Sequence, residues 1–227
     1  MRPDNDLRLV TALPAGKSYG EVDRALREAG WTPCGMGDWA FALRSPNGLY
    51  AVRISPFDPA APYTAALYRE AAHTRQVPML VEHRQLEGGA TLTLMEYLDP
   101  VPEAEAMLFH RAIANRAPEV AELVAHVHAV HTRGVLEQPW WGPLDDNPAN
   151  VMRGADGRLV VTDLFYADGP NLYATARDDP DRLVRAIPEH VRRHMTEIPL
   201  FTSGGWAPRE RERMRVTLAN ADSDNTR

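Results

Sequence analysis

Cysteine is nearly missing from this chain: Cys34 is the only one among 227 residues. A single cysteine excludes an internal disulfide and a metal site built from several thiolates. No run approaches the about 18 apolar residues that a membrane-spanning helix needs, and the N-terminus lacks the apolar core of a signal peptide. We therefore expect a cytoplasmic protein that has no membrane contact.

An excess of positive charge is also absent. The chain has 25 Lys and Arg residues against 31 Asp and Glu, a net charge of −6, and its basic clusters are short. Proteins that bind nucleic acids concentrate positive charge on one face, so we expect no nucleic-acid partner. Apolar residues make up 44% and charged residues 25%, which is typical of globular proteins. The length suits one large domain or two small lobes.

The N-terminal part of the chain alternates helical and strand patterns. A helix is predicted from Ser18 to Gly30, because Glu21 follows Ser18 by three residues, as in a capping box. The segment Pro46-Asn47-Gly48 between two apolar stretches is typical of a β-hairpin. In order, we predict an irregular lead-in over 1–18, this first helix, hairpin strands over 39–43 and 49–54, a helix over about 63–77, and strands near 79–82 and 90–97.

The C-terminal part is mainly helical in pattern. An apolar stripe at helical spacing runs from Val120 to Val130, and Asp156-Gly157 is typical of a turn between short strands. The predicted elements are a linker over 99–102, a helix over about 120–134, a loop over 135–150, a hairpin of 151–152 with 159–161, helices over about 178–195 and 208–219, and a loose tail over 221–227.

Asp145, Asn150 and Asp163 carry the most informative chemistry. Asn150 follows Asp145 by five residues, and Asp163 comes at the end of an apolar strand. Magnesium prefers carboxylate and amide oxygens, and it needs few protein ligands when phosphate oxygens complete its shell. A carboxylate that the metal does not use can accept the proton of an attacking hydroxyl. The simpler interpretation is that Asp145 or Asp146 caps a turn.

At these residues the sequence resembles the protein-kinase-like superfamily, whose catalytic loop is D-x-x-x-x-N and whose further metal ligand begins a D-F-G. The resemblance implies that Asp145 is the catalytic base and that Asn150 and Asp163 bind magnesium, with Asp163 in a variant Asp-Leu-Phe. Asp146 is the competing assignment for the base, but it misses the five-residue spacing to Asn150.

Other residues extend the resemblance in the expected order along the chain. Gly35 and Gly37 precede the first hairpin, as in a glycine-rich phosphate-binding loop. Arg53 ends a strand where the superfamily has its phosphate-binding lysine, and Glu70 lies on the next helix, where it has the ion-pair partner of that cation. The segment around Met95, Glu96 and Leu98 resembles the hinge that binds adenine through its backbone.

Some features depart from protein kinases. Arginine replaces the lysine at position 53, Pro143-Leu144 replace His-Arg before the catalytic Asp, and no A-P-E-like anchor follows Asp163. The segment after Asp163 is also too short for a full kinase C-lobe. The chain is more similar to a compact member of the aminoglycoside-phosphotransferase-like branch, whose catalytic loops share the proline seen at Pro148.

The resemblance implies an α+β, bilobal protein-kinase-like fold. Residues 1–98 would form an N-lobe with a leading helix, a glycine-rich loop and a small five-stranded antiparallel sheet, and residues 99–227 a reduced, mainly helical C-lobe. The implied function is ATP- and magnesium-dependent phosphorylation of a hydroxyl on a small molecule, an antibiotic bearing a sugar or amino-sugar, as in resistance by phosphorylation. A minimal Ser/Thr protein kinase and a nucleotide-binding pseudokinase with a regulatory role are the alternatives. We expect a monomer or a weak homodimer.

Three further groups leave two interpretations each. His126, His128 and His131 lack the i, i+4 spacing of helical zinc pairs, which favours structural histidines. Trp140-Trp141 either stack on the acceptor or pack in the core. The acidic residues that follow Asp163 either line the acceptor site or lie at solvated helix starts; they are Asp168, Asp178, Asp179, Asp181 and Glu189.

Overall fold

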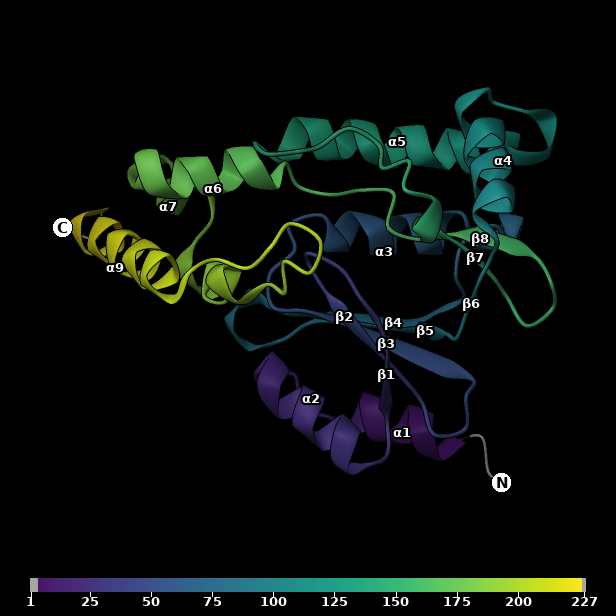
Figure 1. Cartoon of the computed structure of the whole chain (residues 1–227), viewed down its shortest axis with the longest axis horizontal. Coiled ribbons are helices and arrows are strands. Elements are labelled where there is room, and N and C mark those ends of the chain that lie inside the picture. Colours follow the sequence, from purple (N-terminus) through teal and green to yellow (C-terminus); the bar gives the residue numbers. More distant parts are fainter. Residues whose placement is uncertain (1–3, 226–227) are drawn as a thin grey trace.

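A five-stranded antiparallel sheet organises the N-terminal part of the chain in a computed structural model, which describes residues 4–225 (Figure 1). The hairpin predicted at Pro46-Asn47-Gly48 joins the second and third strands, in agreement with its turn chemistry. The strands, in the order in which they pair, are β1 (Thr32–Met36), β2 (Phe41–Arg44), β3 (Tyr50–Ser55), β5 (Thr91–Glu96) and β4 (Leu80–Gln85).

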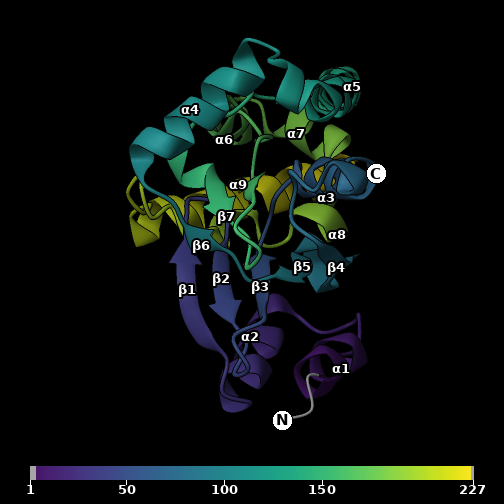
Figure 2. The ribbon, with the colours of Figure 1, turned by 90° about the vertical axis from the view of Figure 1, so that its right-hand side faces the viewer.

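Two helices cover the side of the sheet that faces away from the C-terminal helices, α1 (Asp4–Ala12) and α2 (Tyr19–Glu28) (Figures 1 and 2). The predicted capping box is confirmed, because Ser18 and Glu21 exchange hydrogen bonds at the start of α2. The irregular lead-in predicted over 1–18 is wrong for 4–12, and residues 1–3 lie outside the described range. Helix α1 forms there because burying Val10 against the sheet stabilises it, although Pro14 and Gly16 interrupt the pattern soon after.

Helix α3 (Ala61–Glu70) lies between the sheet and the C-terminal helices (Figure 1). It has a proline in its first turn, Pro62, and buries Leu67 and Tyr68 in the same core cluster as Val127 of the C-terminal part. The helix predicted over 63–77 therefore exists but ends earlier. A 3₁₀ turn over Ala72–Thr74 and the left-handed residue Arg75, with φ of 60°, stop it.

The C-terminal part consists of helices around a small sheet. Its three strands pair in the order β6 (Asp99–Pro100), β7 (Val151–Arg153) and β8 (Leu159–Val161), so the predicted linker contributes a short strand. The predicted hairpin of β7 and β8 is confirmed. The helices are α4 (Glu103–Ala114), α5 (Ala121–Glu137), α6 (Gly169–Asp178), α7 (Pro180–Ala186), α8 (Glu189–Arg192) and α9 (Pro208–Asn225).

The structure corrects the predicted C-terminal helices. The single helix predicted over 178–195 is divided, because α7 begins at Pro180 and Pro188 directly precedes α8, and a proline cannot continue the preceding helix. The predicted tail is helical over 221–225, where Ala221 of α9 packs into the core, and residues 226–227 lie outside the described range. Helix α4 was not predicted. Within residues 4–225, we find no helix with the length and apolar character that crossing a membrane requires.

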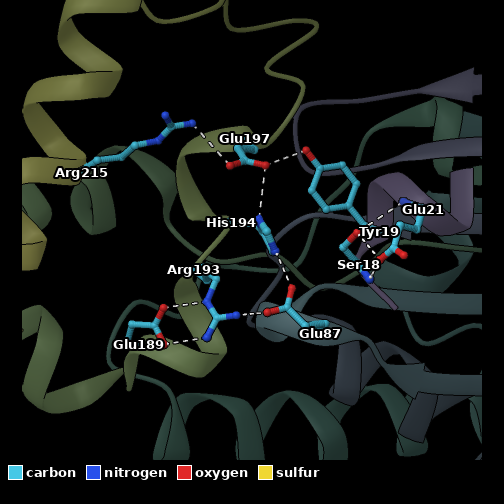
Figure 3. A network of polar contacts seen from close by, with 9 residues as sticks. All are labelled: Ser18, Tyr19, Glu21, Glu87, Glu189, Arg193, His194, Glu197 and Arg215. Atoms are coloured by element: carbon cyan, nitrogen blue, oxygen red, sulfur yellow. Dashed lines mark hydrogen bonds and ion pairs between the residues drawn. The ribbon is translucent and has the colours of Figure 1, made fainter. Parts of the chain in front are cut away.

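Residues 189–197 return to the N-terminal part and form a polar network with it (Figure 3). Glu87, in the turn between β4 and β5, pairs with Arg193 and with His194 Nε2 at 3.3 Å. The Tyr19 hydroxyl donates to Glu197 Oε2 at 2.7 Å. This network holds the C-terminal segment against the edge of the N-terminal part.

Gly89 shows how closely these segments approach. It has a φ of +84°, and a Cβ placed there would overlap the backbone carbonyl of Val191. Gly157 has almost the same φ, +86°, but a Cβ there would meet nothing within 4 Å. We expect Gly157→Ala to cost about 1–2 kcal/mol of unfolding free energy through backbone strain, and Gly89→Ala to cost at least about 2 kcal/mol more. Urea denaturation of both variants measures the difference, and equal costs would contradict the close packing.

Candidate functional site

A cleft of about 600 Å³ lies between the five-stranded sheet and the C-terminal part. Its walls come from the β1–β2 turn, β3, the end of β5 and the loops around β7 and β8. All but one of the predicted site residues line this cleft: Gly35, Gly37, Arg53, Met95, Glu96, Leu98, Asp145, Asn150 and Asp163. The exception is Glu70.

Asp145, Asn150 and Asp163 form one hydrogen-bonded group at the floor of the cleft. Asp145 Oδ1 accepts from the Asn147 amide at 2.9 Å, which fixes the loop that leads to Asn150. Asn150 Nδ2 donates to Asp145 Oδ2 and to the Asp163 backbone carbonyl, each at 2.9 Å. The hairpin of β7 and β8 brings Asp163 beside Asn150, so residues 13 positions apart share one site.

The donor atoms of this group fit a magnesium ion. Both hydrogens of Asn150 Nδ2 are used by acceptors, which leaves Oδ1 as the atom that can bind a cation. The Asp163 side chain is 35% exposed and supplies a carboxylate oxygen. In the described part of the chain no three His, Cys, Asp or Glu side chains come together around a possible metal. A cation at this site would thus rely on Asn150, Asp163 and the oxygens of a phosphorylated ligand.

Arg53 bridges two carboxylates above this group. Its Nε donates to Asp163 Oδ2 and its Nη2 donates to Asp58 Oδ2, both at 3.0 Å. Burial would lower the pKa of Arg53, but the charges of Asp163 and Asp58 outweigh burial and raise that pKa, so the guanidinium keeps its charge. A permanent positive charge is thereby fixed inside the cleft.

The predicted Arg53–Glu70 ion pair is wrong. Glu70 pairs instead with Arg133 of α5, with 2.6 Å between Nη2 and Oε1, and it is exposed. Tyr68 is the residue of α3 that lines the cleft. Because an α-helix has 3.6 residues per turn, Glu70, two positions after Tyr68, is rotated by about 200° about the helix axis and faces away from the cleft.

Asp58 is the ion-pair partner of Arg53, the role that the sequence predicted for Glu70. It lies in the loop between β3 and α3, and its side chain is 6% exposed. Burial raises the pKa of this carboxyl, although Arg53 opposes the effect. The sequence feature that could have identified this partner is an acidic residue five positions after Arg53, directly before Pro59 and ahead of the predicted helix.

Asp38 is a second residue that sequence reasoning missed. It sits in the turn after Gly37, and its carboxylate accepts from the Thr202 amide and hydroxyl, each at 2.6 Å, and from the Ser203 amide and hydroxyl. Burial would raise the pKa of Asp38, but these hydrogen bonds outweigh it and lower that pKa. Phe201 and Thr202 line the cleft, so residues 200–203 form an additional wall beside the glycine-rich turn.

Removing the Asp38 carboxylate tests this contact. In Asp38→Ala the amides of Thr202 and Ser203 lose their acceptor, so we expect their hydrogen exchange to accelerate at least about tenfold. The Ser203→Ala variant keeps both amide bonds and serves as the control. Unchanged protection of Thr202 and Ser203 in Asp38→Ala would show that the contact does not hold the segment.

Packing decides between the two interpretations given for Trp140, Trp141 and His131. Trp140 is 3% exposed in the core with Leu172, and its Nε1 donates to Thr175 at 3.1 Å. Trp141 Nε1 donates to His131 Nδ1 at 3.0 Å. Trp140 packs in the interior, Trp141 is partly buried against the core, and His131 has a structural partner, as the simpler interpretations predicted.

The acidic residues after Asp163 lie mainly at helix ends. Asp168 caps α6 by accepting from the Asn171 amide at 3.2 Å, and Asp179 caps α7 by accepting from the Arg182 amide at 3.2 Å. Asp178 is exposed and pairs with its neighbour Arg177. The interpretation as helix starts is confirmed for Asp168 and Asp179.

Comparisons with known proteins gave matches among solved structures alone. No family model matches the chain, and no curated protein matches its sequence. An apo pseudokinase is 15% identical over 93% of this chain and 89% of its own, with a TM-score of 0.35. The pseudokinase drought responsive inactive kinase 1, bound to ENMD-2076, is 16% identical over 95% of this chain and 89% of its own, with a TM-score of 0.36. Aminoglycoside phosphotransferase APH(3'')-Id from Streptomyces rimosus is 16% identical over 95% and 96%, with a TM-score of 0.32.

The architecture is α+β. It combines the antiparallel five-stranded sheet, the helix α3 between β3 and β4, and a helical C-terminal part with the β7–β8 hairpin. At these identities and TM-scores the matched structures assign neither a family nor an activity to the chain.

Proposed function

We propose that this protein is an ATP- and magnesium-dependent phosphotransferase that acts on a hydroxyl of a small molecule. The observation that carries the proposal is the meeting of Asp145, Asn150, Asp163 and Arg53 in one cleft. This set provides a general base, two oxygen ligands for a cation and a fixed positive charge. Transfer of a phosphoryl group depends mostly on positioning and on neutralising charge, which are the functions that these groups serve.

Each residue has a defined role in the proposal. The backbone of Met95, Glu96 and Leu98 would bind adenine, while backbone N–H groups near Gly35 and Gly37 would approach the phosphates. Arg53 would contact the phosphates, and Asn150 with Asp163 would hold magnesium. The bound ion would supply charge neutralisation. Asp145 would accept the proton of the acceptor hydroxyl.

The surroundings of Asp145 favour a cationic acceptor. Tyr166 lines the cleft, and burial together with the nearby charges of Asp145, Asp168 and Asp146 raises its pKa. The Asp145 carboxylate lines the same cleft, and its negative charge suits a hydroxylated molecule that carries ammonium groups. An antibiotic with an amino-sugar is the acceptor class that we propose.

One observation favours a second candidate, a nucleotide-binding pseudokinase. Arg53 replaces the usual lysine and pairs with Asp163, the carboxylate that the first proposal assigns to magnesium. In an inactive protein this ion pair would persist when nucleotide binds. A binding protein without phosphate transfer would then result.

A mass-spectrometric assay separates these functions. The protein is incubated with ATP, magnesium and a pool of hydroxylated antibiotics, and the masses of the small molecules and of the intact protein are measured. We expect one antibiotic to gain a phosphate. Phosphate gained by the protein alone would favour a minimal protein kinase, and bound ATP without any transfer would favour the pseudokinase.

A further inference from the structure

We propose that Asp58 is the positioning residue that holds Arg53 in the geometry required for nucleotide binding. This inference rests on the proposed function, because it concerns the same nucleotide site. It assigns the role to a residue of the loop between β3 and α3 and removes it from α3 itself.

The Asp58 carboxylate is fixed by both of its oxygens. Oδ2 accepts from Arg53 Nη2 at 3.0 Å, and Oδ1 accepts from the Ala60 amide at 2.9 Å, next to the start of α3. The side chain is 6% exposed, so solvent screens the pair with Arg53 only weakly. A buried carboxylate held at both oxygens gives Arg53 a partner with a fixed position.

Asp58 also limits how Arg53 interacts with Asp163. Arg53 uses Nη2 for Asp58 and Nε for a single oxygen of Asp163. Without the charge at Asp58, the guanidinium could turn and bind both oxygens of Asp163, which is the arrangement that arginine and carboxylate prefer. A bidentate pair would compete with a cation for Asp163. Asp58 therefore keeps Asp163 accessible as well as holding Arg53.

Glu70 cannot do this, because it contacts a different element. Its carboxylate pairs with Arg133 and so links α3 to α5. The orientation of Arg53 is set by Asp58, five residues away along the same chain segment. A small movement of the C-terminal end of α3 would consequently leave Arg53 in place.

The test compares two matched substitutions, Asp58→Asn and Glu70→Gln, in the full chain. Binding of ATP is measured by calorimetry at several magnesium concentrations, so the readout does not depend on catalysis. Asp58→Asn retains a side-chain oxygen for the Ala60 amide. We expect it to weaken ATP binding at least about tenfold and to raise the magnesium concentration needed for half-maximal binding, whereas Glu70→Gln stays within about twofold of the wild type.

A double-mutant cycle distinguishes positioning from a structural role. In an Arg53→Met background, Asp58→Asn should cause no further loss of ATP binding, because there is no guanidinium to position. The inference is overturned if Asp58→Asn binds like the wild type, if Glu70→Gln weakens binding equally, or if Asp58→Asn acts undiminished without Arg53. A wild-type protein that transfers no phosphate but shows the expected binding pattern would refute the proposed enzyme and support the role of Asp58. A wild-type protein that does not bind ATP would refute both.

Discussion

Asp163→Ala is expected to lower the rate of phosphate transfer at least about a thousandfold, which corresponds to about 4 kcal/mol of lost transition-state stabilisation. The change removes a proposed magnesium ligand and one of the two carboxylates that hold Arg53. The Asp163 backbone carbonyl still accepts from Asn150, so the floor of the cleft should keep its shape. Steady-state kinetics with the acceptor from the mass-spectrometric assay give the rate, and a magnesium titration shows whether the response to the metal is lost.

Asp23→Ala is the control for this experiment. Asp23 lies on α2, on the far side of the sheet from the cleft, and forms an ion pair with Arg27. We expect the rate of phosphate transfer by Asp23→Ala to stay within about twofold of the wild type, as for most surface substitutions. A comparable loss in both variants would point to unfolding, and full activity of Asp163→Ala would refute the assignment of Asp163.

Asp145→Asn is expected to reduce kcat by about a hundredfold to ten-thousandfold while the affinity for ATP changes little. The amide has the shape of the carboxylate, but it cannot accept the proton of the acceptor hydroxyl. Asp145 is not one of the two proposed metal ligands, and among the hydrogen bonds described for residues 4–225 it makes none with Arg53, so nucleotide binding should persist. Rapid-quench measurement of the transfer step together with calorimetry of ATP binding separates the two effects.

Asp146→Asn provides the matched comparison, since Asp146 was the competing assignment for the base. Its side chain is exposed, whereas Asp145 accepts a hydrogen bond from Asn150 inside the cleft. We expect Asp146→Asn to retain kcat within about twofold. If Asp146→Asn loses transfer and Asp145→Asn keeps it, the base is Asp146.

Several features of this protein could be predicted because they depend on neighbouring residues. The capping box at Ser18 and Glu21 and the hairpin turn around Asn47 use hydrogen bonds and backbone angles within a few residues. That Asn150 and Asp163 lie side by side could also be inferred, because the two strands of a short hairpin bring the residues at its open end together. The cleft residues that follow from these local patterns all line one cavity.

Other features depend on contacts between segments that are distant in sequence. The burial of Tyr68 in the core sets the rotation of α3 about its own axis. This rotation directs Glu70 toward α5, and Arg53 pairs with Asp58 instead. Asp38 meets Thr202 only because the C-terminal segment packs back on the N-terminal part.

No local pattern contains these partners, because the free energy that selects them comes from burying apolar surface across the whole molecule. The sequence was sufficient to identify Arg53, Asp145, Asn150 and Asp163 as residues of the site, but it did not identify Asp58 or Asp38. Packing in three dimensions specifies which of these groups contact one another.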